Sequence, residues 1–204
     1  RLLEYLNMIK FKDILENKIL VPRRLDTRKE DQKRVTLQKI KQYIKNRSKG
    51  DLHLRKTSIN SLPDNLETVG GSLNLEKTQI TSLPSNLKSV GGHLSLAYTR
   101  INSLPDNLKT VGGSLYLTGT KITSLPDNLK VGGDLDLDNT PITSLPDNLK
   151  VGEYLYLNSS KITSLPDSLV VGKNLYLNHT PISKKYSKEE IRKMVPGVKG
   201  NILI

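Results

Sequence analysis

The chain has no cysteine among its 204 residues, and it has no tryptophan and only one phenylalanine. Without cysteine it cannot form a disulfide, bind a metal through thiolates or use a cysteine nucleophile. Long apolar runs are also missing, because none approaches the ~18 residues that a membrane helix needs. No signal peptide is recognisable either. We therefore expect a protein that does not enter a membrane and carries no visible signal for secretion.

Motifs for catalysis and for cofactors are missing as well. No phosphate-binding loop, dinucleotide fingerprint or nucleophile turn occurs. The three histidines, His53, His93 and His179, fall in different parts of the chain without a motif around them. We therefore interpret them as surface residues, and we predict no enzyme activity, no cofactor, no metal and no small-molecule substrate.

The net charge of +12 is unevenly distributed along the chain. Residues 1–50 carry +9, residues 51–182 carry −1, and residues 183–204 carry +4. These differences in net charge divide the chain into three expected parts: a basic helical cap, a nearly neutral repeat array and a second cap.

A phrase close to Thr-x-Ile-Thr-Ser-Leu-Pro-Asp-Asn-Leu-Lys-Val-Gly-Gly-x-Leu-x-Leu returns throughout residues 51–182. Its paired leucines are spaced by 21 residues three times and then by 20 residues three times. This period predicts a solenoid of about six full repeats and a partial seventh, in which each repeat is one coil.

Each repeat has a predictable layout. The Leu-x-Leu segment alternates apolar and variable residues, so we expect a short strand with leucines inward and variable residues outward. Pro126-Asp127-Asn128 and its equivalents favour a tight turn on the opposite side. One glycine is kept in all six turns, as in Gly132, which indicates a special backbone conformation or a close approach between coils.

Both ends carry helix signals. At the N-terminus we expect a first helix up to Val21-Pro22 and a second from a capping box at Thr27–Glu30 to about Asn46. Val35, Leu37, Ile40 and Ile44 should face inward and cover the first coil.

At the C-terminus, Ser187 and Glu190 form another capping box, which predicts a short helix to about Val195. Pro196-Gly197 should end it, and residues 201–204 should add a last strand beside Leu175–Leu177.

These repeats resemble leucine-rich repeat proteins of the short bacterial type that carry a Leu-Pro turn in each repeat. The Thr-Ser-Leu-Pro-Asp-Asn-Leu phrase is similar to repeat proteins encoded by bacteriophages and bacteria. The resemblance implies an α/β solenoid, a leucine-rich repeat horseshoe with short parallel strands on its concave side. It also implies a protein of the bacterial cytoplasm or of a virion. Threonine replaces the usual asparagine, as at Thr78, and its hydroxyl should partly tie neighbouring coils together.

Tyrosine and aspartate gather on the outward positions of the later strands. The residues concerned are Tyr116, Asp134, Asp136, Asp138, Tyr154, Tyr156 and Tyr176. Exposed tyrosine is common in binding sites, although it also stacks well within sheets. The aspartates fail the calcium-loop pattern at Asn139 and Leu145, so a cationic side chain of a partner suits them better.

We therefore predict a protein-protein interaction module that binds a protein partner on its concave face. The resemblance implies a phage-encoded or bacterial protein that engages a host protein or forms part of a virion. The alternative is nucleic-acid binding through the basic N-terminal segment. Its candidate phosphate-binding residues are Arg23, Arg24, Arg28, Lys29, Lys33 and Arg34.

Overall fold

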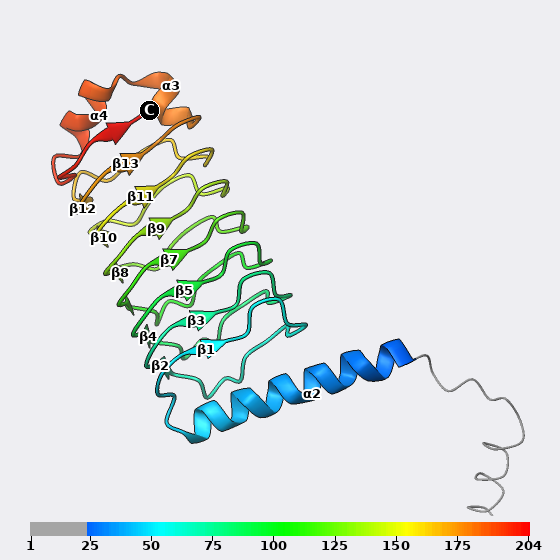
Figure 1. Cartoon of the computed structure of the whole chain (residues 1–204). Coiled ribbons are helices and arrows are strands. Elements are labelled where there is room, and N and C mark those ends of the chain that lie inside the picture. The colour runs from blue at the N-terminus through cyan, green and yellow to red at the C-terminus, as the bar shows by residue number, and fades with distance from the viewer. Residues whose placement is uncertain (1–23) are drawn as a thin grey trace, which may run out of the picture.

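The computed structural model describes residues 24–204, which form a solenoid of parallel strands with helices at both ends (Figure 1). The first sheet has eight strands in the order β1-β3-β5-β7-β9-β11-β13-β14. Their bounds are Leu52–His53, Leu73–Asn74, Leu94–Ser95, Leu115–Tyr116, Leu135–Asp136, Leu155–Tyr156, Leu175–Tyr176 and Ile202–Leu203. The leucine-rich repeat solenoid predicted from the sequence is thereby confirmed.

The pairing register follows the repeat spacing. Leu52 pairs with Leu73, and Leu155 pairs with Leu175. Both leucines of every Leu-x-Leu segment are buried in one continuous core, whereas the residue between them faces outward. Every repeat has a turn after its proline. The Leu66 amide donates to the Pro63 carbonyl there, and the same bond recurs at Pro84, Pro105 and Pro166. The predicted strands, their inward leucines and the turns are all confirmed.

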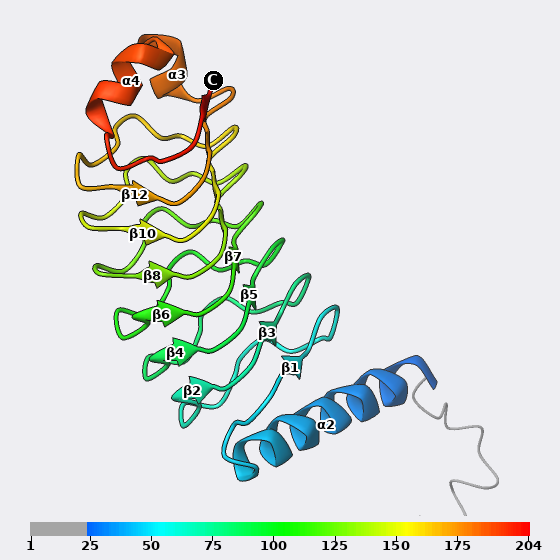
Figure 2. The same ribbon diagram turned by 60° about the vertical axis from the view of Figure 1, so that its left-hand side comes forward.

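A second parallel sheet, which the sequence analysis did not predict, runs along another side of the coil (Figure 2). Its strands β2, β4, β6, β8, β10 and β12 span Thr68–Val69, Ser89–Val90, Thr110–Val111, Lys130–Val131, Lys150–Val151 and Val170–Val171. Each of these strands runs directly into a glycine, a residue depleted in strands, so the sequence pattern did not indicate a strand there. The inward valines of this sheet complete the core.

The repeated glycine allows the coils to approach each other closely beside this second sheet. A Cβ atom on Gly152 would lie 2.0 Å from the carbonyl oxygen of Gly132, and one on Gly132 would lie 2.1 Å from that of Gly112. No side chain fits at such distances. Close approach, rather than a left-handed backbone, therefore explains why this position is always glycine.

The threonine column acts within coils and does not link them, which corrects the sequence prediction. The Thr78 hydroxyl donates to the Leu75 carbonyl of its own coil at 2.7 Å, and the other threonines of the column repeat this bond. Ser160 occupies the same position but its buried hydroxyl has no partner within the described residues.

The N-terminal helix α2 (Arg24–Lys45) begins three residues before the predicted capping box, so Thr27 lies inside it. The first predicted helix and the Val21-Pro22 break lie outside the described residues. Thr36, Ile40 and Tyr43 are buried against the first coil, whereas Val35 and Leu37 are 59% and 39% exposed.

The prediction that Val35 and Leu37 face inward is therefore wrong. Ile40 and Ile44 do pack against the core, as predicted. Thr36, in place of Val35 and Leu37, continues this inward face, and its hydroxyl donates to the Gln32 carbonyl.

The C-terminal cap contains α3 (Pro181–Lys185), α4 (Lys188–Met194) and β14. The capping box of Ser187 and Glu190 and the pairing of β14 with β13 confirm two predictions. Helix α3 was not predicted. None of the helices within residues 24–204 has the length and apolar character needed to cross a bilayer.

Candidate functional site: the outer face of the first sheet

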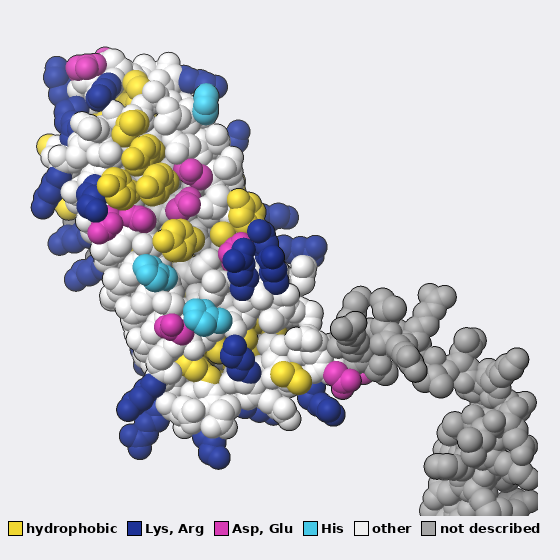
Figure 3. Space-filling model, in the orientation of Figure 1, with side chains coloured by type: hydrophobic (Ala, Val, Ile, Leu, Met, Phe, Trp, Pro, Cys, Tyr) yellow, Lys and Arg dark blue, Asp and Glu magenta, His cyan; other side chains and the backbone are white. Residues whose placement is uncertain are grey.

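The outward side chains of the first sheet form one continuous surface, which we call the strand face (Figure 3). The in-register pairing aligns equivalent outward residues of successive coils, as in Tyr116, Asp136, Tyr156 and Tyr176. In the figure, hydrophobic and acidic side chains gather on the upper half of this face, with histidine side chains below them and another near the upper right edge.

Three of the four predicted tyrosines are in mutual contact and form what we call the tyrosine cluster: Tyr154, Tyr156 and Tyr176. The rings of Tyr156 and Tyr176 stack with centroids 4.7 Å apart and planes 12° apart. Tyr154 lies 6.0 Å from Tyr156 and 6.3 Å from Tyr176. All three side chains are half-buried. Burial, together with the nearby Asp134 carboxylate, raises the pKa of Tyr156.

Tyr116 does not belong to this cluster. Asp136 separates it from Tyr156 in the register of the sheet. Its ring neighbour is His93, with centroids 6.3 Å apart. The predicted patch therefore divides into two parts, one on each side of the aspartate strand β9.

The three aspartates of β9 and its flanks also accept backbone hydrogen bonds. Asp134 accepts from the Tyr154 amide at 3.1 Å, and Asp136 from the Asp138 amide at 3.0 Å. Asp138 accepts from both the amide and the side chain of Asn158. Each aspartate thus helps to hold the solenoid, in addition to any role in binding.

None of these three carboxylates forms an ion pair within residues 24–204. Burial raises the pKa of Asp138, and the Asp136 charge adds to this effect. In Asp134 and Asp136, one oxygen atom makes none of these backbone bonds and can accept from a partner.

The residues just before each strand form a ladder between coils. The side chains of Asp51, Ser72, His93, Ser114 and Asp134 each accept from the backbone amide of the equivalent residue one coil later. Backbone amides at the edge of the strand face thereby obtain hydrogen-bond acceptors. This column is therefore structural.

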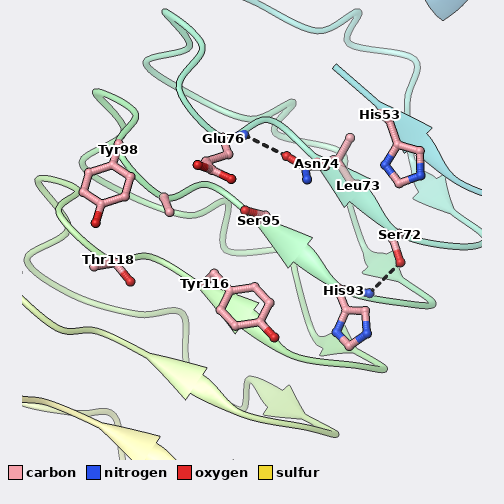
Figure 4. Close-up of a pocket in the computed structure, with 11 residues that line it drawn as sticks. His53, Ser72, Leu73, Asn74, Glu76, His93, Ser95, Tyr98, Tyr116 and Thr118 are labelled. Atoms are coloured by element: carbon pink, nitrogen blue, oxygen red, sulfur yellow. Dashed lines mark hydrogen bonds between the residues drawn. The ribbon is translucent and has the colours of Figure 1, made fainter. Parts of the chain in front are cut away.

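A second feature of the strand face is a hollow of about 470 Å³ over β3, β5 and β7, which we call the N-terminal hollow (Figure 4). Ser95 and Ala97 lie at its centre, and Glu76, Tyr98 and Tyr116 are among the residues around it. The sequence analysis missed this site because it considered large outward residues. The available signal was the opposite one: β5 carries the smallest outward residues of their columns.

Charges beside the tyrosine cluster and the hollow are mostly paired. Glu76 contacts Arg55 at 3.0 Å and Lys77 at 3.2 Å. Lys173 contacts Glu153 at 3.2 Å, and its ammonium lies 4.9 Å from the centre of the Tyr154 ring. The Asp134–Asp138 segment is thus the part of the strand face with unpaired acidic charge among the described residues.

Within residues 24–204, His93 and His53 both contact residues of the ladder. His93 Nδ1 accepts from the Ser114 amide at 2.8 Å, so this nitrogen is occupied by the ladder. His53 lies 3.5 Å from Asp51, which itself belongs to the ladder. Within residues 24–204, no group of three or more histidine, aspartate or glutamate side chains is arranged to hold a metal ion.

The alternative phosphate-binding residues are only partly described. Arg23 lies outside the described residues, and Arg24, Arg28 and Lys29 are known only as positions at or near the start of α2. Lys33 and Arg34 are exposed, and Arg34 lies 3.7 Å from Asp31.

Comparison with known proteins gives structural similarity alone. No family model and no curated sequence matches the chain. The leucine-rich repeat domain of a Shigella effector aligns with a TM-score of 0.47 and 20% identity, over 84% of this chain and 88% of that one. A leucine-rich repeat protein of Leptospira interrogans aligns with a TM-score of 0.39 and 24% identity, over 74% of this chain and 54% of that one.

Proposed function

We propose that the protein is a non-enzymatic binding module that holds a protein partner against the strand face, the side expected to be concave. The tyrosine cluster is the centre of this contact. The observation that carries the proposal is three touching, half-exposed tyrosines beside carboxylates that have no cation partner within the described residues. Tyrosine is enriched among the residues that dominate binding energy at interfaces.

Rigidity supports this proposal. The three tyrosines lie on or next to strands whose leucines are fully buried, and Tyr156 and Tyr176 already stack on each other. Their rings would therefore lose little conformational freedom when a partner binds. The free oxygen atoms of Asp134 and Asp136 suit an arginine or lysine of that partner.

The repeat phrase suggests where such a module would act. Its resemblance to phage and bacterial repeat proteins leads us to propose a bacterial cell as the setting. There the module would engage a host protein or form part of a virion.

Affinity capture from the native host, followed by binding measurements with the purified partner, tests the proposal. The double variant Tyr156→Ala/Tyr176→Ala should weaken binding by at least about tenfold, the effect expected at the centre of an interface. Thr123→Ala/Thr143→Ala is the matched control, because both threonines are exposed away from the strand face. Undiminished binding by a folded tyrosine variant would refute this assignment.

Nucleic-acid binding through α2 is the second candidate. Lys33, Lys41 and Lys45 are exposed and form no ion pair with any side chain of residues 30–204. This candidate requires DNA or RNA binding that weakens steeply as salt increases. Absence of retention in a filter-binding assay at low salt would eliminate it.

A further inference from the structure

The N-terminal hollow results from the side-chain sizes on three adjacent coils. Ser95 aligns with Asn74 on one side and with Tyr116 on the other. On the same coil, Ala97 is the smallest residue of its column and is 8% exposed. The middle coil therefore carries small outward side chains between coils with larger ones. This difference leaves the hollow of about 470 Å³. Pockets of this size accommodate small ligands or the anchoring side chains of a partner.

One aromatic wall of the hollow is held in position from both sides. A Cβ atom at residue 119 would lie 3.0 Å from the Tyr98 ring, so Gly119 provides the space that this ring occupies. The Lys77 ammonium lies 5.2 Å from the centre of the same ring. Tyr98 is nevertheless 57% exposed, which leaves much of the ring free for contact.

The opposite wall is also aromatic. Tyr116 and His93 pair with their centroids 6.3 Å apart and their planes tilted by 35°. The His93 ring is fixed because its Nδ1 accepts from the Ser114 amide. In the neutral ring the proton is then on Nε2, which can donate to a ligand.

The polar groups of the hollow are uncharged or compensated. Glu76 is its one carboxylate and pairs with both Arg55 and Lys77. The Ser95 hydroxyl, the Thr118 hydroxyl and the Asn74 side-chain NH₂ donate no hydrogen bond within residues 24–204. An uncharged group with an apolar body and a hydrogen-bond acceptor fits this lining better than an ion does.

We propose that the N-terminal hollow binds an aromatic side chain presented by the protein partner. This inference rests on the proposed function and assigns it a second anchor point, separate from the tyrosine cluster. An aromatic occupant can make tilted or offset contacts with the rings of Tyr98, Tyr116 and His93. An aliphatic occupant gains only the buried area, and a charged one would lose hydration without a free counter-charge.

The sequence provides a direct reporter, because Ala97 is the only alanine in the chain. Protein labelled with ¹³C at the alanine methyl gives one NMR signal, from the floor of the hollow. N-acetyl-L-tyrosinamide is the probe, and we expect a saturable shift with a dissociation constant on the order of 1 mM. N-acetyl-L-leucinamide and methyl α-D-glucopyranoside should bind at least about tenfold more weakly, a difference of about 1.4 kcal/mol.

Ser95→Leu places a branched side chain at the centre of the hollow and keeps the Ala97 reporter, so it should abolish the tyrosinamide response. Thr123→Leu adds the same side chain away from the strand face and should leave the response unchanged. No saturable shift in the wild-type protein, an equal response to the leucine or sugar probe, or an unaffected Ser95→Leu variant would each overturn the inference.

A failure of the hollow in these tests can be distinguished from a failure of the proposed function. Partner capture that depends on Tyr156 and Tyr176, combined with no response at Ala97, removes the hollow and keeps the binding module. A saturable response at Ala97, combined with partner capture that does not depend on either tyrosine, keeps the hollow as a binding site and removes the tyrosine cluster as the centre of the contact.

Discussion

The two halves of the strand face differ in surface although they share one scaffold. Over β3, β5 and β7 the outward residues are small at the centre, and the Glu76 charge is compensated. Over β9, β11 and β13 the residues are tyrosines and aspartates, and the aspartate charges have no ion-pair partner in the described chain. The core leucines and the glycine column continue unchanged through both halves.

This difference teaches that the repeat specifies the coil and leaves the outward positions free to vary. A hollow and a tyrosine cluster can therefore be built on one sheet without changing the buried leucines. The following predictions test whether the halves share stability and differ in recognition, from the largest expected effect to the smallest.

Alanine in the glycine column should destabilise both halves to a similar extent. Gly112→Ala and Gly152→Ala each place a Cβ atom within 2.1 Å of a carbonyl oxygen of the preceding coil. We expect a loss of about 3 kcal/mol or more in the free energy of unfolding, measured by denaturant titration. Glu153→Ala, one residue further on, is the control and should change little. Tolerance of one glycine substitution but not of the other would show that the scaffold is not uniform.

Removal of charge should affect partner binding through the second half of the face. In Asp134→Asn/Asp136→Asn, each side chain keeps the oxygen that accepts its backbone bond but loses its charge. We expect association with the partner to slow about threefold to tenfold at low ionic strength, and less at high salt. Stopped-flow or surface-based kinetics measures this. An association rate equal to that of the wild type at low salt would argue against a cationic partner site.

Ser160→Thr should stabilise the second half by about 1 kcal/mol. The added methyl group would be buried, and threonine at this position bonds to its own coil, as Thr140 does. The reciprocal change Thr120→Ser in the first half should lose a similar amount. Thermal unfolding of both variants gives the comparison, and a destabilised Ser160→Thr protein would contradict it.

The smallest expected effect is on the pH dependence of stability, and it arises only in the half of the strand face over β9, β11 and β13. Because burial raises the pKa of Asp138, its contribution to stability is present below the usual carboxyl pKa. It is lost as the pH rises through the raised value. Asp138→Asn should therefore reduce the change in melting temperature across that acidic window. If the melting temperatures of the variant and the wild-type protein depend on pH in the same way, Asp138 does not contribute to the pH dependence of stability.

Much of the fold could be predicted because the same local sequence pattern recurs in every repeat. The paired leucines, the turns and the Ser187 capping box all follow from local patterns. The second sheet could not be predicted in this way, because strands such as Lys130–Val131 run directly into glycine, which is depleted in strands. The inward face of α2 was misplaced because a buried threonine, Thr36, looks polar in a sequence.

The candidate site was predictable only where it consists of large residues. Tyr154, Tyr156 and Tyr176 were expected and lie together. Tyr116 was expected with them but contacts His93, because the aspartate coil lies between. The hollow depends on the small side chains of Ser95 and Ala97 relative to their neighbours, which requires the register between coils.

Site-specific photo-crosslinking tests the central claim, that the partner lies on the strand face. A photoreactive phenylalanine analogue, which keeps an aromatic ring, replaces Tyr176 of the tyrosine cluster, Thr118 at the rim of the hollow, or Lys130 on the second sheet, in cells that make the protein. We predict crosslinked partner from the first two positions and none from Lys130. Crosslinking from Lys130 alone would contradict the account.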